Sequence, residues 1–110
     1  MRIAFMTALA LFAGAPVAGQ AATPKLTTAN FARASECVAL AQAPSLQQEA
    51  PDVSALEAEI DRQKHRVHEL AAAKAREAVK AVRIKAKRAD TPEEVEGLKA
   101  DLRRACAGLV

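Results

Sequence analysis

The chain has 110 residues, with 16 Lys and Arg against 13 Asp and Glu, and a formal net charge of +3 at pH 7. Its composition is 51% hydrophobic, but only 3% is aromatic and Trp and Tyr are absent, so few large side chains are available to fill a core. A small domain with so thin a core usually needs a covalent cross-link or a partner, and the composition excludes a large self-sufficient fold.

Residues 1–21 have the layout of a secretory signal peptide. A basic residue at position 2 precedes an apolar run over residues 3–12, and small residues follow. An uncleaved anchor is the alternative, but even residues 3–17 would form a helix of only ~22 Å, against a hydrocarbon core of ~30 Å. We expect cleavage after Ala21, or else after Ala22. The mature chain 22–110 is then periplasmic or secreted, with no transmembrane segment.

The two cysteines are Cys37 and Cys106. Exported compartments are oxidising, so an even pair in a short exported chain predicts a disulfide within the chain. An intermolecular bridge and free thiols are the alternatives. Neither residue belongs to a Cys-x-x-Cys pair or lies beside a histidine, which disfavours a metal or catalytic role.

A first helix is predicted over residues 28–42. Thr27 suits the N-cap position, and Phe31, Ala34 and Val38 recur at helical spacing. Pro44 and Pro51 then interrupt the pattern, so residues 43–52 are predicted to be a linker.

A second helix is predicted over residues 53–89, where proline and glycine are absent and nearly every residue favours a helix. It would be ~55 Å long. Its apolar stripe carries the larger aliphatic residues Val53, Leu56, Ile60 and Val67 in the first half, and mostly alanine in the second.

A third helix is predicted over residues 92–108. Thr91 at the N-cap, Pro92 at the first helical position and Glu94 three residues after the cap form the pattern of a capping box. Cys106 shares a face with Leu98 and Leu102, so it is expected to point toward the other helices.

These elements predict an all-α fold: a small three-helix bundle or hairpin around one long central helix, with a disulfide joining its first and third helices. An extended linker would let the first helix pack beside the third. The first half of the long helix would then project, and Val53, Leu56, Ile60 and Val67 would form an exposed seam for a helical partner or for self-association.

Seven basic residues and one acidic residue lie between Lys74 and Arg88. Arg76, Lys80, Arg83 and Lys87 form one row, which we place opposite the apolar face of the helix. One interpretation is a solvated face, neutralised in part by acidic residues of the third helix. The other is a surface for an envelope protein or another anionic surface. Nucleic acid is disfavoured by export and by the lack of interleaved aromatic residues.

His65 and Glu69 are spaced i, i+4 and could hold a metal, but the sequence places no third ligand, so we expect none. No cofactor is expected, and the motifs of common enzyme classes are absent. The sequence therefore predicts a small exported, non-enzymatic helical protein of the cell envelope that acts through protein–protein interaction. The alternatives are a chaperone-like or stress protein that binds unfolded clients, and a weak metal-responsive binder.

Overall fold

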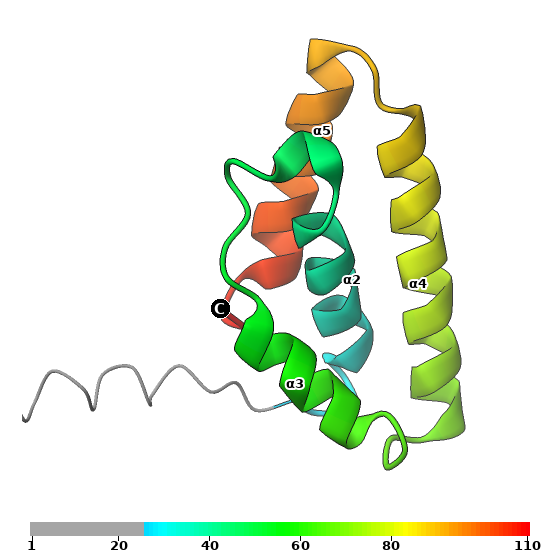
Figure 1. The fold of residues 1–110 in the computed structure, drawn as a ribbon. Helices are drawn as coiled ribbons and strands as arrows, with labels where there is room; N and C mark the ends of the chain where they lie inside the picture. Colours follow the sequence, from blue (N-terminus) through cyan, green and yellow to red (C-terminus); the bar gives the residue numbers. More distant parts are fainter. Residues whose placement is uncertain (1–25) are drawn as a thin grey trace, which may run out of the picture.

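The structure, a computed structural model, describes residues 26–110 and is all-α in that range, as predicted (Figure 1). The expected signal peptide lies outside the described residues. The elements are α2 (Phe31–Ala41), a short 3-10 helix η1 (Pro44–Leu46), α3 (Ser54–Gln63), α4 (Glu69–Arg88) and α5 (Pro92–Cys106).

The short helix α2 is the centre of the bundle. It contacts α3, α4 and α5, and Figure 1 shows it between α4 and α5. Its charged residues are only Arg33 and Glu36, and a helix that is apolar on nearly every side is buried on nearly every side. Its buried residues are Phe31, Ala34, Ser35, Cys37, Val38, Ala39, Leu40 and Ala41. The prediction that the second helix is the central one is therefore wrong.

The predicted continuous helix over residues 53–89 is also wrong, because a turn at residues 64–68 divides it into α3 and α4. The reason lies in the length of α2, whose 11 residues extend only about 16 Å. A straight helix of ~55 Å could cover α2 with only part of its apolar stripe. The turn lets both halves of the stripe pack against the same short helix.

Local chemistry supports the turn. The Val67 N–H donates to the carbonyl oxygen of Gln63 at 3.0 Å, which closes the end of α3. His68 is the N-cap of α4, and its Nδ1 accepts a hydrogen bond from the Leu70 N–H at 3.1 Å. Val and His are also weaker helix formers than the residues on either side, so a break costs least here.

The predicted exposed seam lies in the core. Leu56 is only 1% exposed, and Val53, Ile60 and Val67 are half-buried against the core. Because α3 folds back onto α2, these residues already have an internal partner. The expectation that the seam lacks an internal partner is therefore wrong, and most of it is covered within the molecule.

The linker is folded rather than extended. Leu46 of η1 is 1% exposed, and η1 contacts α5. Gln47 Nε2 donates to the carbonyl oxygens of Ala41 at 3.2 Å and Ala43 at 2.9 Å. The first bond satisfies a carbonyl group at the C-terminal end of α2. The Ala43 carbonyl oxygen also accepts from the Leu46 N–H at 3.0 Å.

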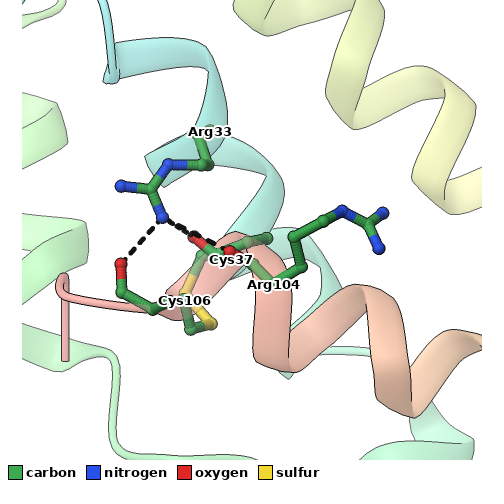
Figure 2. The surroundings of a disulfide bond; sticks show 6 residues. Arg33, Cys37, Arg104 and Cys106 are labelled. Atoms are coloured by element: carbon green, nitrogen blue, oxygen red, sulfur yellow. Dashed lines mark hydrogen bonds between the residues drawn. A yellow bond between two sulfur atoms is a disulfide. The ribbon is translucent and has the colours of Figure 1, made fainter.

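The predicted disulfide is confirmed. Cys37 and Cys106 are joined, with an S–S distance of 2.01 Å and a Cα–Cα distance of 4.9 Å (Figure 2). The bridge links the middle of α2 to the last residue of α5, across a sequence separation of 69 residues. In the loop-entropy model, such a cross-link contributes ~4 kcal/mol, comparable to the whole stability of a small domain.

A second link between the same two helices was not apparent in the sequence. The guanidinium of Arg33 donates from Nη1 to the carbonyl oxygens of Arg104, Ala105 and Ala107 at 3.3, 3.1 and 2.8 Å (Figure 2). These carbonyls lie at the C-terminal end of α5, where a cation also interacts favourably with the helix dipole.

The capping box of α5 is present as predicted. The Glu94 N–H donates to Thr91 Oγ1, and the Thr91 N–H donates to Glu94 Oε1, both at 3.1 Å. Backbone hydrogen bonds from Asp90 and Thr91 hold the pKa of Glu94 below its usual range. The helix ends at Cys106, two residues earlier than predicted, and Gly108 follows with a positive φ of 75°.

The position of α3 can be tested with two matched leucine substitutions. Leu56→Ala should lower the free energy of unfolding by about 2–5 kcal/mol, because it leaves a cavity in the core. Leu70, which is 68% exposed, provides the control. Leu70→Ala should change the free energy of unfolding by less than about 0.5 kcal/mol. Urea denaturation of the oxidised proteins measures both values. Equal, small effects would contradict the packing of α3 on α2.

Candidate binding groove

A groove of about 850 Å³ lies between α2, the end of α3, the turn after it, and α4. A second hollow of about 650 Å³ shares Arg83 and Ile84 with the first and continues along α4 to Ala89. From residue 72 to residue 89, the two together extend about 26 Å along the helix. We call this surface the α4 groove.

The first part of the α4 groove combines apolar and basic side chains. Its apolar lining consists of Phe31, Ile60, Ala72, Ala75, Val79 and Ile84, and its polar lining of Ser35, Lys64, His65, Arg76, Lys80 and Arg83. No acidic residue lines this part. An apolar surface bordered by cationic groups suits a ligand that is both apolar and negatively charged.

The basic row Arg76, Lys80, Arg83 and Lys87 borders the groove. All four side chains are exposed; the first three line the first hollow, and Arg83 and Lys87 line the second. In the sequence, each residue of the row comes directly after a residue of the buried or half-buried face of α4. Successive residues are about 100° apart around an α-helix, so the row lies about 100° from that face. The expectation that the row lies opposite the apolar face is therefore wrong.

The acidic residues of α5 do not neutralise the row. Asp101 contacts Lys85 at 2.6 Å and Arg104 at 2.7 Å, and Glu96 contacts Lys99 at 3.0 Å. Among residues 26–110, no ion pair within 4.0 Å includes a member of the row. The four cations are thus left to solvent or to a partner.

Shifted pKa values accompany the ion pairs away from the groove. Partial burial raises the pKa of Asp101, but hydrogen bonds and attraction from Lys85 and Arg104 outweigh this and hold it below its usual range. Lys99 contacts Glu49 at 2.8 Å, and the hydrogen bonds that its ammonium group donates to Glu49 and Glu96 raise its pKa. These pairs connect α5 to α4 and to the turn after η1.

Two acidic residues of α3 also lie close to the groove. Glu57 and Asp61 lie in an adjoining hollow that Arg83 also lines. Glu57 accepts a hydrogen bond from Gln42 Nε2 at 3.0 Å, and Asp61 lies 3.5 Å from Lys64 Nζ. The groove therefore has a basic edge on α4, and on its α3 side Lys64 and His65 line it while Glu57 and Asp61 lie in the hollow beside it.

Other predicted site residues do not come together. The turn between α3 and α4 contains His65, whereas Glu69 is the first residue of α4, so their expected i, i+4 spacing on one helix is lost. In the part of the chain that the structure describes, no three His, Cys, Asp or Glu residues are grouped to hold a metal. Of the predicted seam, only Ile60 lines the first part of the α4 groove.

The sequence did not reveal the contribution of α2 to the groove. Phe31 and Ser35 line it only because α2 packs between α3 and α4. Ile84 carried a usable signal, since it is a large apolar residue off the predicted stripe, and it remains 43% exposed beside the basic row. Within residues 26–110, no helix has the length and hydropathy needed to cross a bilayer.

The basic row is not expected to stabilise the fold. Its members form three like-charged pairs at i, i+3 or i, i+4, each destabilising a helix by roughly 0.2–0.5 kcal/mol. Replacing all four with Gln should keep the helicity and change the free energy of unfolding by less than about 1 kcal/mol, because the relieved repulsion is offset by losing the favourable position of Lys87 in the last turn of α4. Circular dichroism and urea denaturation measure both quantities.

Lys85→Gln is the control, because this side chain is ion-paired with Asp101. It should lower stability slightly, by up to about 1 kcal/mol. A loss of several kcal/mol in the fourfold variant would instead assign the row a structural role.

Comparison of the chain with protein-family models, curated proteins and solved structures finds no match.

Proposed function

We propose that this protein is a small, exported, non-enzymatic binding protein of the cell envelope, and that it binds a negatively charged partner through the α4 groove. The observation that carries the proposal is the row of four exposed basic residues beside an apolar hollow, with no acidic residue of the described chain paired to it. The signal-peptide pattern of residues 1–21 supports export.

The arrangement of charge supports a partner surface over a merely solvated face. Solvation alone does not require cations in one line, and their alignment raises the energy of the free helix. An acidic partner would remove this repulsion and gain attraction that steers its approach. The apolar lining would add contact area that a simple counterion does not use.

Several groups that catalysis could use have other roles, which supports a non-enzymatic function. Cys37 and Cys106 are joined in the disulfide, and the hydroxyl of Ser35 donates to the Phe31 carbonyl oxygen at 3.1 Å. The carboxyl groups with lowered pKa values belong to hydrogen-bonded turns and caps and to ion pairs. An activated nucleophile or base would need a different environment.

Binding of unfolded clients is less well supported. A holding chaperone needs a broad exposed apolar surface. The exposed large hydrophobic residues of the described chain are Leu70, Ile84 and Val110, at the start of α4, beside the groove and at the C-terminus. The area of apolar contact is therefore narrow, and it adjoins a specific pattern of charge.

Export gives a direct prediction. When the full chain is expressed in a bacterium, the folded product should appear in the periplasmic fraction or the medium. Its intact mass should correspond to a chain that begins at Ala22, because the predicted cleavage follows Ala21. A folded product that retains Met1 would contradict export with cleavage.

Binding through the row can be tested with poly-L-glutamate as an acidic probe. The oxidised mature chain should bind it in low salt and lose affinity as salt rises, since counterions screen the charges. Changing Arg76, Lys80, Arg83 and Lys87 to Gln should weaken binding at least tenfold. Titration calorimetry at several salt concentrations provides the measurement.

A matched control removes the same amount of charge elsewhere. Lys74, Arg88, Arg66 and Arg103 are exposed and lie outside the α4 groove. Changing these four to Gln should weaken binding much less than the row variant. Equal losses in the two variants would show that net charge alone, and not the groove, attracts the probe.

A further inference from the structure

The spacing of the basic row indicates the secondary structure of the partner as well as its charge. Successive members are four, three and four residues apart, so the row extends about 16 Å along α4. Carboxylates that repeat at this spacing in a nearly straight line occur along one edge of another α-helix. A flexible acidic chain could also reach the four cations, but only by giving up conformational freedom along its whole length.

The apolar part of the groove fits the adjoining edge of such a helix. The groove is open along about 26 Å, which equals the length of a helix of roughly 17 residues. Ser35, Ala72 and Ala75 are small and permit close approach, whereas Val79 and Ile84 provide apolar contact. Amphipathic helices bind grooves of this kind by their apolar edge.

We propose that the α4 groove binds an amphipathic α-helix of a partner protein, a conclusion that rests on the proposed function. Acidic residues of the partner at positions i, i+4, i+7 and i+11 face Arg76, Lys80, Arg83 and Lys87, in either direction of the helix. The apolar edge of the partner faces Val79 and Ile84.

Two carboxylates in the hollow beside the groove restrict the rotation of the partner helix. Glu57 and Asp61 lie on the α3 side, across from the basic row. A helix with carboxylates on both edges would place some of them near these two residues, where like charges repel. Lys64 pairs with Asp61, so the repulsion comes mainly from Glu57, and the partner carries its continuous acidic row on the edge that faces α4.

A protein helix fits the observations better than an anionic lipid surface. The apolar residues Val79 and Ile84 line a groove, whereas a planar bilayer would contact mainly the edges of such a hollow. Membrane-bound helices instead present a convex apolar face that enters the boundary between headgroups and acyl chains.

The probe is a fluorescein-labelled 18-residue peptide, rich in Ala and Leu, with Glu at i, i+4, i+7 and i+11 and Leu on the adjoining edge. Fluorescence anisotropy with the oxidised mature chain should give micromolar affinity. A peptide of the same composition in scrambled order, which separates the Glu and Leu positions, should bind at least tenfold more weakly. The fourfold Gln variant of the row should bind the patterned peptide about thirtyfold more weakly, as expected for four partly exposed ion pairs.

Ile84→Glu and Leu70→Glu form a matched pair, because both place a carboxylate at an exposed apolar position of α4. Only Ile84 lines the groove. Ile84→Glu should weaken binding of the patterned peptide at least tenfold, and Leu70→Glu by less than twofold. Circular dichroism checks that the variants are folded. If Ile84→Glu does not fold, the fourfold Gln variant of the row tests the inference in its place.

Two outcomes would overturn the inference. The first is equal affinity for the patterned and scrambled peptides. If poly-L-glutamate still binds through the row in that case, the proposed function stands and only the helical partner is wrong. The second is tighter binding to phosphatidylglycerol vesicles than to the peptide, weakened by Ile84→Glu, which would assign the groove to a lipid surface.

Discussion

Burial of α2 on nearly all sides is the constraint on which the fold depends. The helix extends only about 16 Å, yet α3, α4 and α5 all contact it. Ala34, Ala39 and Ala41 are buried in it, and such small side chains let neighbouring helices approach closely but bury little area themselves. The disulfide and the Arg33 hydrogen bonds both attach the C-terminal end of α5 to this helix. These two links compensate for the small apolar area that the core buries.

The arrangement also explains why α4 has a free flank. α4 packs on α2 through Ala75 and Val82, and it is joined to α5 by the Lys85–Asp101 ion pair. These contacts use only part of its circumference, so the side chains one position further around the helix border the groove. An alanine-rich helix would gain little from burying that flank as well, and its charged residues would have to be desolvated.

Features controlled by local chemistry could be predicted from the sequence. The capping pattern at Thr91 and Glu94 predicts the start of α5, and the cysteine pair predicts the bridge once export is assumed. The turn between α3 and α4 could not be found in this way, because residues 64–68 contain no glycine or proline. It depends on the length of α2, which is a property of the whole fold. The available local signs were the interruption of the apolar stripe at Gln63 and Lys64 and the weaker helix formers Val67 and His68.

Only one part of the candidate groove, the basic row, could be predicted from the sequence. The other part depends on how the helices pack, as the turn between α3 and α4 does. The basic row follows from charge and helical period alone, but its neighbours Phe31 and Ile60 come from two other helices. Had the second helix been continuous, its aliphatic seam and its basic row would have been two separate surfaces. The turn moves Leu56 into the core and brings Lys64 and His65 to the groove beside the row. One change of backbone direction thus covers most of the expected seam and concentrates apolar contact and positive charge on a single surface.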